Sequence, residues 1–276
     1  MKRPKISVVM PAYNAEQYIA ESIESILNQT FADFEFIIIN DGSTDKTADI
    51  VKSYDDKRIK FIDNQENQGI VPVLNQGLSM ARGEYIARMD SDDISHLNRF
   101  EKQVSYMDNH PECGVLSSSY HMFGEKEAKF IHPEHVGLVD LLDGCVVAHP
   151  AVMMRKSVID KYEFRYSSNF RYAEDYELWS RMVLVTGIHN LPEVLLEYRW
   201  HANNVSVEHA KTQCQLTNII KQNILNKLTE NTALQQRILY RYKIGFLLPK
   251  WFGRICCLFI PNRTKRHNFR ARYVKA

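Results

Sequence analysis

The chain has 276 residues, of which 45% are hydrophobic, so it can bury the core of one large α/β domain plus an appendage, and its composition excludes a mainly disordered protein. The formal net charge of +2 hides an asymmetry, because residues 241–276 hold ten Lys or Arg and no Asp or Glu, leaving residues 1–240 at a formal −8. Five cysteines without a Cys-x-x-Cys pair favour core packing in a reducing cytoplasm over disulfides or zinc, and the apolar run Ile6–Met10 is too short for a signal-peptide core.

The first half of the chain alternates apolar runs with segments of helical periodicity. Strands are predicted at Ile6–Met10, Phe34–Asn40, Ile59–Ile62 and Tyr85–Met89. Helices are predicted over 16–28, after Asp45 as far as Tyr54 with Ser43 or Thr44 as the cap, and over 70–81. Such alternation produces a parallel sheet, in which the carboxyl ends of the strands share one edge. We therefore expect Asp41 and Asp90, which follow two of these strands, to face one crevice.

Three aspartates, Asp90, Asp92 and Asp93, follow the strand predicted at 85–89. Carboxylates this close repel one another, so a fold tolerates them best in water or around a cation, and oxygen ligands alone suit Mg²⁺ or Mn²⁺. An acidic turn before the next helix explains the same residues equally well. Neither G-x-G-x-x-G nor a P-loop occurs in the first turn, so nucleotide binding there has to use acids and a metal.

The second half is less regular. A helix is predicted over 97–109 and a strand at Cys113–Ser117, followed by a loop-rich stretch over 119–145 and an apolar segment interrupted at His149-Pro150. Glu174 and Asp175 open another predicted helix, with Leu178, Met182 and Val185 as its apolar positions, and a last strand is predicted at Val194–Trp200. Acids in a first helical turn are favoured by the helix dipole, so this pair has a structural explanation besides a catalytic one.

Three long motifs, at Ser7–Asn14, Ile39–Asp45 and Gly83–Asp93, occur in one order and resemble the signature of glycosyltransferase family 2, over about residues 5–205. The resemblance implies an inverting sugar transferase of the GT-A fold. That fold is α/β, with a Rossmann-like mixed sheet flanked by helices. We expect the catalytic domain to span 1–207 and a helical, basic, amphipathic extension to span 208–276.

The resemblance also implies which residues bind the donor. The expected nucleoside pocket is lined by Pro11, Ala12, Tyr13 and Asp41. The Asp-x-Asp element Asp90-Ser91-Asp92 is expected to hold the ribose and a diphosphate-bound Mn²⁺ or Mg²⁺, whereas Asp93 is explained equally by a helix start. His201 is either a further contact to the metal or diphosphate or a loop histidine, and Arg199 is a candidate pyrophosphate contact.

On the acceptor side, the resemblance places Asp175 as the general base, with Glu174 as a supporting acid. A base there removes the proton of the acceptor hydroxyl as that oxygen attacks the anomeric carbon. The helix N-terminus is expected to favour the ionised form of Asp175. His149 lies either near the acceptor or in the buried scaffold.

The expected activity is transfer of a sugar from a nucleotide-diphospho-sugar, a UDP-sugar by preference, to a hydroxyl of a glycan or lipid-linked glycan during surface-polysaccharide biosynthesis. One alternative acceptor is a polyprenyl phosphate, which is already ionised and needs no base. A second alternative is a non-catalytic nucleotide-sugar-binding subunit, against which the intact Asp90, Asp92 and Asp175 argue.

The C-terminal region changes character. Two helices are predicted over 208–244, and the segment 244–260 carries Lys250, Arg254 and Pro249, which make it a poor transmembrane span. Its mixture of apolar, aromatic and cationic residues suits the surface of an anionic membrane, so we expect a cytoplasmic enzyme held peripherally at the inner face of the cell membrane through 244–276. A helix packed on the domain with a solvated basic end is the alternative. Nucleic acid is not expected as a partner, because the negative body would repel it.

Overall fold

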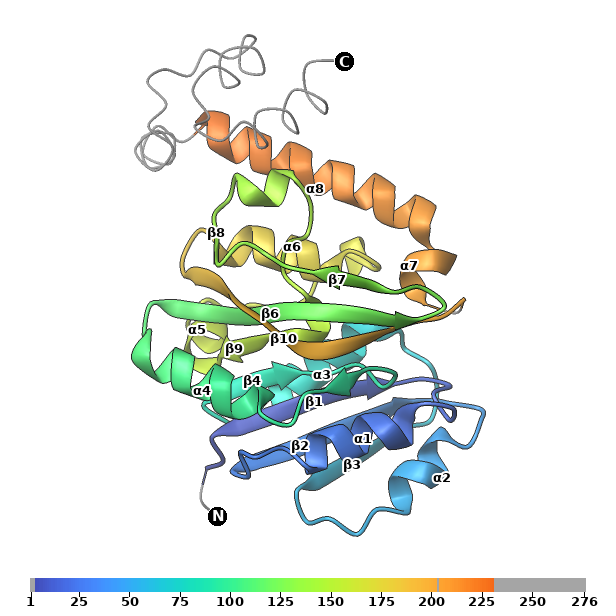
Figure 1. The fold of residues 1–276 in the computed structure, drawn as a ribbon. Helices are drawn as coiled ribbons and strands as arrows, with labels where there is room; N and C mark the ends of the chain where they lie inside the picture. The colour runs from blue at the N-terminus through green and yellow to red at the C-terminus, as the bar shows by residue number, and fades with distance from the viewer. Residues whose placement is uncertain (1–2, 203, 231–276) are drawn as a thin grey trace. The chain divides into compact units, whose positions relative to one another are not determined.

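A computed structural model of the protein describes residues 3–202 and 204–230 (Figure 1). The helix predicted in the last part of 208–244 and the membrane-binding segment 244–276 therefore lie outside the described residues. The chain divides into two compact units, Met1–Asn218 and Ile219–Ala276. The predicted domain boundary after residue 207 stays a prediction.

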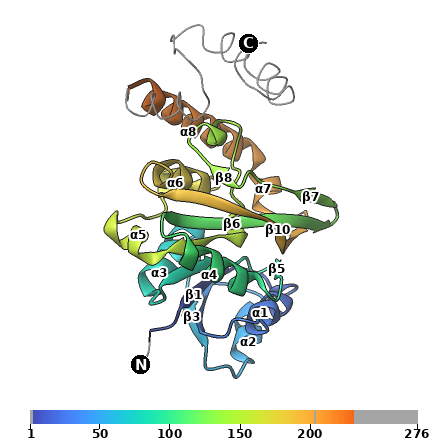
Figure 2. The ribbon, with the colours of Figure 1, turned by 60° about the vertical axis from the view of Figure 1, so that its left-hand side comes forward.

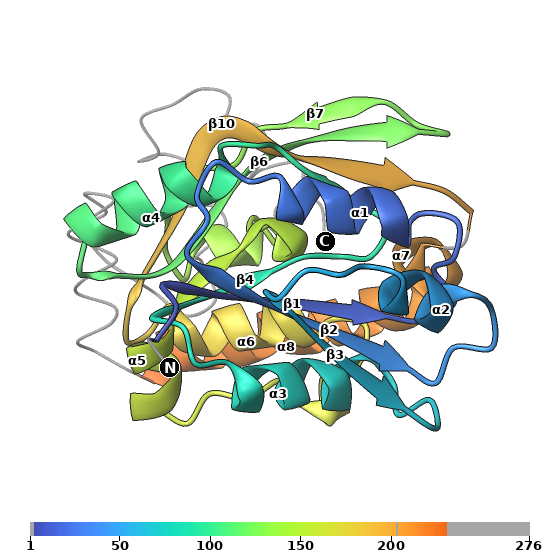
Figure 3. The same cartoon turned by 90° about the horizontal axis from the view of Figure 1, so that it is seen from below.

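Four parallel strands form the first half of the sheet, as predicted. They are β1 (Ile6–Ala12), β2 (Phe34–Asp41), β3 (Ile59–Asn64) and β4 (Tyr85–Arg88), in the spatial order β3-β2-β1-β4 (Figure 3). The register pairs Ala12 with Asn40 and Val9 with Arg88, so the loops that carry Tyr13, Asp41 and Asp90 leave one edge of the sheet. The shared edge predicted for these strand ends is confirmed, whereas the crevice expected there stays a prediction.

The second half makes the sheet mixed. The antiparallel strand β9 (Met153–Arg155) joins β4 to β6 (Cys113–Gly124), which pairs with the parallel strand β10 (Gly187–Trp200). The short strands β5 (Ile94–Ser95) and β8 (His135–Val136) pair with β10, and β7 (Ala128–Phe130) pairs with β6. The mixed sheet expected from the family resemblance is therefore present.

The strands β6 and β10 run well beyond their predicted bounds, and part of the stretch predicted as loop-rich is strand. The reason for β6 is a run of serines, Ser117 to Ser119, that are fully buried without being apolar. Their hydroxyls donate to backbone carbonyls, as Ser117 Oγ does to the Ala148 oxygen at 3.0 Å. Because these bonds satisfy the buried hydroxyls, the strand continues where the apolar pattern stops.

Helices cover both faces of the sheet. The helices are α1 (Ile19–Leu27), α2 (Thr47–Lys52), α3 (Ile70–Met80), α4 (Arg99–Asn109), α5 (Lys156–Lys161), α6 (Glu174–Met182), α7 (Val205–Glu208) and α8 (Ala210–Glu230), with short 3-10 turns at Asp140–Leu142, His149–Ala151 and Ser168–Phe170. Figure 3 shows α1 and α3 on opposite sides of β1 to β3, and Figures 1 and 2 show α4 and α6 on opposite sides of β6 and β10.

The core reflects this two-sided cover. Alternate residues of β1, such as Val8 and Met10, pack with α1 and α4 in one cluster, while Val9 lies on the other face against α3. There a Cβ at Gly77 would clash with the Val9 side chain, so glycine permits the close approach of helix and strand. Burial on both faces explains why these strands are continuous apolar runs in the sequence.

Two local predictions are wrong. Helix α6 ends at Met182, and Val185, predicted on its apolar face, is 43% exposed beyond it. Neither Ser43 nor Thr44 caps α2, which starts at Thr47 with its N–H bonded to Asp45 Oδ1 at 3.0 Å. Instead the N–H of Thr44 donates to Asn14 Oδ1 at 2.9 Å, which joins the loops after β1 and β2.

None of the helices within 3–202 and 204–230 is long and apolar enough to cross a membrane.

Candidate active site

The loops after β1 and β2 form one wall of the crevice. Pro11 and Ala12 are the buried last residues of β1, and Tyr13 is half exposed at its tip. Asp41 ends β2 and is buried, and its two carboxylate oxygens accept the N–H groups of Gln68 at 2.9 Å and Gly69 at 2.8 Å. Asp41 therefore holds the start of α3 against the strand ends, and its expected contact with a nucleoside stays a prediction.

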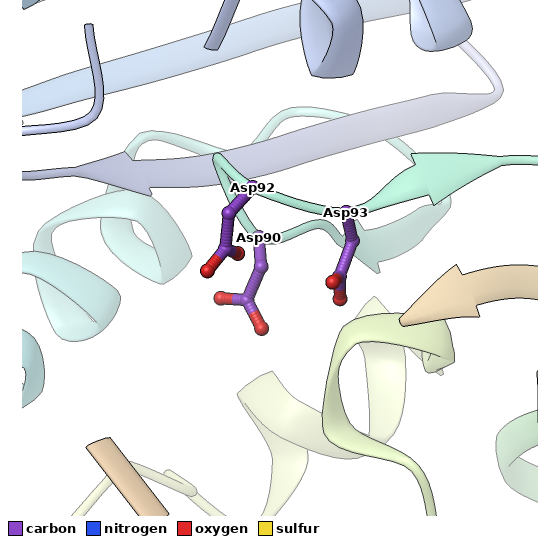
Figure 4. Close-up of side chains that lie close together, drawn as sticks. All are labelled: Asp90, Asp92 and Asp93. Atoms are coloured by element: carbon purple, nitrogen blue, oxygen red, sulfur yellow. The ribbon is translucent and has the colours of Figure 1, made fainter. Parts of the chain in front are cut away.

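The three aspartates after β4 converge. One carboxylate oxygen each from Asp90, Asp92 and Asp93 lies within 4.8 Å of the others, and Figure 4 shows the three side chains extending from one turn of the β4–β5 connection, with Ser91 between them in the chain. Asp93 is 1% exposed; its Oδ1 accepts the N–H of Arg199 at 2.8 Å, while its Oδ2 has no hydrogen-bond partner. Burial and the neighbouring Asp92 and Asp90 raise the pKa of Asp93 well above its usual range.

This cluster fits a divalent cation. An unpartnered buried carboxylate oxygen costs free energy, and three acids at this spacing repel one another. A cation among them would relieve both penalties, and the donor set consists of hard oxygens. The alternative of a simple acidic turn does not explain why Asp93 is buried with one oxygen unpaired.

Two side chains from β10 and the residues after it, Arg199 and His201, border the cluster. Arg199 donates from Nε to the Asp92 carbonyl at 2.8 Å, pairs with Glu21 of α1, and lies 4.6 Å from the ring centres of both Tyr18 and Phe123. His201 Nε2 lies 3.0 Å from Asp92 Oδ2, and its ring stacks on Tyr18. His201 therefore lies beside Asp92, while its expected contact with a metal or diphosphate and the pyrophosphate contact of Arg199 stay predictions.

A buried arginine, Arg88, contacts the cluster. It is not among the site residues predicted from the sequence. It is 5% exposed and pairs with Asp90, and its backbone carbonyl accepts a 2.7 Å hydrogen bond from the equally buried Arg99. Its charge opposes the rise in pKa that burial causes at both Asp90 and Asp175. The Arg88 guanidinium thus acts on the aspartates after β4 and on the predicted base.

The acidic pair opens α6, as predicted. Glu174 is 8% exposed, and its Oε2 accepts the N–H of Tyr172 at 2.6 Å. Burial, and then the charge of Asp175, raise the pKa of Glu174 to about 7. Asp175 Oδ1 accepts the N–H of Tyr176 at 2.7 Å, and the Cys145 thiol donates to Oδ2 at 3.7 Å.

The helix N-terminus favours the ionised form of Asp175, as expected, but it is not the largest influence on this carboxyl group. The Tyr176 N–H does favour the carboxylate, but burial outweighs it and raises the pKa of Asp175. A raised pKa makes a carboxylate a stronger base, provided that it is ionised at the working pH.

His149 belongs to the buried scaffold. Its Nε2 lies 2.9 Å from the hydroxyl of Tyr166, and burial lowers its pKa well below the usual range. The Tyr166 hydroxyl in turn interacts electrostatically with four charged residues, namely Arg88, Asp175, Glu174 and Asp90. His149 therefore helps to hold Tyr166, which interacts electrostatically with both acidic groups.

A pocket of about 340 Å³ opens beside Asp175. We call it the α8 pocket, and it is lined by Cys145, Ala173, Asp175, Tyr176, Ala210, Gln213, Cys214 and Thr217. The sequence did not indicate it, because its residues are scattered and none belongs to a motif except Asp175. Cys113 is buried, as predicted for the cysteines, whereas Cys145 and Cys214 are exposed, which corrects that prediction for these two.

Comparison with known proteins agrees with this geometry. The profile of the family described as Glycosyl transferase family 2 matches residues 7–167. The chain is 37% identical over 244 residues to an uncharacterized glycosyltransferase of Haemophilus influenzae, covering 82% of this chain and 76% of that one. It is 31% identical over 205 residues to the Escherichia coli UDP-Glc:alpha-D-GlcNAc-diphosphoundecaprenol beta-1,3-glucosyltransferase WfgD, covering 73% and 79%.

Solved structures share the fold at low identity. S. aureus TarS 1-349 in complex with UDP-GlcNAc aligns with a TM-score of 0.66 at 19% identity, covering 98% of this chain and 88% of that chain. The mannosyltransferase PcManGT from Pyrobaculum calidifontis, in complex with GDP-Man and Mn²⁺, aligns with a TM-score of 0.64 at 14% identity, covering 99% and 76%. These alignments confirm the GT-A fold expected from the sequence.

Proposed function

The chain belongs to glycosyltransferase family 2, and from this premise we propose that it transfers a sugar, with inversion, from a UDP-sugar to a hydroxyl of a glycan or lipid-linked glycan in cell-surface polysaccharide biosynthesis. One observation carries the proposal. Arg88 pairs with Asp90 among the aspartates after β4, and its charge also acts on Asp175 in the pair that opens α6, so one buried guanidinium links two acidic groups of different character. Such an arrangement suits a reaction that needs a cation at a leaving group and a base at a nucleophile.

On the donor side, Asp90, Asp92 and His201 are proposed to hold Mn²⁺ or Mg²⁺, with Ser91 and Arg199 nearby for the diphosphate and Pro11, Ala12, Tyr13 and Asp41 for the nucleoside. A bound divalent cation stabilises the charge that grows on the diphosphate as it leaves. Asp93 and Arg199 hold the loop that carries these ligands, through the 2.8 Å bonds described above. The Mn²⁺ in PcManGT and the UDP-sugar named for WfgD support this choice of metal and donor.

On the acceptor side, Asp175 is proposed as the base. The acceptor oxygen attacks the anomeric carbon, the bond from that carbon to the diphosphate oxygen breaks, and the hydroxyl proton passes to an Asp175 carboxylate oxygen. Glu174, whose pKa is about 7, carries part of the negative charge of the pair near neutral pH. The Cys145 thiol orients the carboxylate from one side.

The test is calorimetric titration of a panel of UDP-sugars, with and without Mn²⁺, against the wild type and Asp92→Ala. We expect binding that requires Mn²⁺ and is lost in Asp92→Ala but kept in the control Asp55→Ala, which removes an exposed aspartate far along the chain. Binding that is indifferent to Mn²⁺ and to Asp92 would contradict the proposed metal site.

The proposal extends to the location of the enzyme. We infer that it works in the cytoplasm and that residues 244–276 hold it at an anionic membrane surface. Vesicles of anionic phospholipid should bind the full chain and release a chain that ends at residue 243, and equal binding of both would contradict this part.

A further inference from the structure

The α8 pocket is not explained by the donor site. It opens beside the proposed base rather than beside the aspartates after β4, and it receives side chains from three separate parts of the chain. Cys145 comes from the segment before the His149–Ala151 turn, Ala173 to Tyr176 from the start of α6, and the remaining wall from the start of α8. A ligand in this pocket would lie against the group that removes a proton.

The wall from α8 is one helical face. Gln213, Cys214 and Thr217 lie three, four and seven residues after Ala210, which places all four on the same side of a helix. Lys211, Thr212 and Gln215 lie between them in sequence and are exposed without lining the pocket. The first two turns of α8 therefore present one defined surface toward Asp175.

This wall is attached to the loop that carries the base. The side-chain amide of Gln213 donates to the Tyr172 carbonyl at 2.9 Å, and the ring of His209 stacks on the Tyr172 ring with centres 3.9 Å apart. Tyr172 has a φ of 81°, which is rare for a residue with a side chain, and its N–H bonds to Glu174. The start of α8 and the acidic pair are thus joined through a single residue.

The chemistry of the lining selects a class of ligand. None of the residues that the structure describes around the pocket is cationic, and Asp175 is the charged one among them. A phosphate would meet that carboxylate without a counter-charge, which is unfavourable in a partly enclosed site. The amide of Gln213, the hydroxyl of Thr217 and the two thiols instead offer neutral polar contacts, and the volume lies within the range of small-molecule sites.

We propose that the α8 pocket binds the neutral sugar that carries the acceptor hydroxyl, and that Gln213, Cys214 and Thr217 determine which acceptor the enzyme accepts. The proposal rests on the function proposed above and adds a location and a chemical class for the acceptor. It implies that a polyprenyl phosphate group is not the attacking nucleophile.

The experiment places larger side chains of α8 in the pocket and measures two quantities separately, the Kd for the donor and the KM for the acceptor. Cys214→Trp places a large ring inside the pocket, and Gln215→Trp places the same ring on the exposed side of the same helix as the matched control. Thr217→Leu is a smaller filler on the pocket face, which keeps the test decisive if Cys214→Trp does not fold. The probes are alkyl glycosides as neutral acceptors and undecaprenyl phosphate as the ionised one.

We expect the wild type to glycosylate at least one alkyl glycoside. For that acceptor, Cys214→Trp should raise the KM by about tenfold or more and Thr217→Leu by a smaller factor, while the calorimetric Kd for the UDP-sugar stays unchanged. Gln215→Trp should leave both constants at the wild-type values.

An unchanged acceptor KM in both pocket variants, or transfer to undecaprenyl phosphate alone, would overturn this inference and leave the donor site intact. A wild type that binds no nucleotide sugar would overturn the proposed function, and this inference with it. The two failures are distinguishable because donor binding is measured in every variant.

Discussion

The donor half and the acceptor half of the crevice are built in different ways. The residues from Pro11 to Asp92 that are proposed to bind the donor lie at the end of a parallel strand or in the loop that follows it. The sheet register alone brings these loops together. The acceptor half is assembled from Cys145, the start of α6 and the start of α8, which no strand pairing connects. Topology thus positions the proposed donor residues, whereas packing positions the proposed acceptor residues.

The charges of the two halves differ as well. The aspartates after β4 are bordered by Arg88, which pairs with Asp90, by Arg199, which bonds the Asp92 carbonyl, and by His201 beside Asp92. The pair Glu174 and Asp175 has a hydrogen-bonded thiol beside it and depends on Arg88 at longer range. Because of this difference, we expect that mutations can impair donor binding and proton removal separately.

The largest expected effect is at the base. Asp175→Asn keeps the shape of the side chain but removes the proton acceptor, so transfer should fall by about 10²–10⁴-fold while the Kd for the UDP-sugar stays within about twofold of the wild type. Steady-state kinetics and calorimetry on the same preparations measure the two quantities. Asp160→Asn, on the surface of α5, is the control.

Two outcomes would break the separation. Transfer that survives in Asp175→Asn would favour an acceptor that is already ionised, as a polyprenyl phosphate is. Loss of donor binding together with transfer would show that Asp175 supports the structure of both halves.

A smaller effect is expected in the pH dependence of stability at Glu174. Its pKa in the folded protein is about 7, above the ordinary value of 4.5, so the folded state binds the proton more tightly than the unfolded state does. The resulting stabilisation is fully present below pH 4.5 and is lost as the pH rises through 7. Glu174→Gln should remove this loss and, between pH 5 and pH 8, gain on the order of 2 kcal/mol relative to the wild type.

Urea unfolding of both proteins at the two pH values measures the difference. Glu66→Gln, at an exposed glutamate, is the control for the substitution itself. If the free energy of unfolding changes with pH equally in Glu174→Gln and in the wild type, Glu174 is not held in the neutral form by its surroundings.

The smallest effect is expected at Arg199. Arg199→Lys keeps the charge but loses the geometry that bonds the Asp92 carbonyl and stacks between Tyr18 and Phe123, so the donor loop should loosen. We expect the Kd for the UDP-sugar to rise about tenfold, with little change in the pH profile of transfer. Calorimetry against Arg58→Lys, whose arginine pairs with Asp56 away from the crevice, measures this, and an unchanged Kd would remove Arg199 from the donor half.

The elements of the donor half could be predicted closely because their signals are local. A strand buried on both faces is a continuous apolar run, and an acid placed directly after it marks the strand end. The same logic failed for β6, where buried serines interrupt the apolar run, and for Val185, whose spacing continues a helical pattern beyond the real end of α6. Ser43 and Thr44 are good capping residues in general, but here they serve the contact between two loops.

The family and the order of strands and helices in the parallel half could be predicted from the sequence, which also singles out Asp90, Asp92 and Asp175 as candidates, because each of these inferences depends on residues adjacent in the chain. Three features became visible only in the folded chain: the charge of Arg88 acts on both acidic groups, burial rather than the helix terminus dominates the pKa of Asp175, and α8 lines a pocket with Cys145. Burial, charge interaction and pocket shape arise between residues far apart in sequence, so no local pattern encodes them.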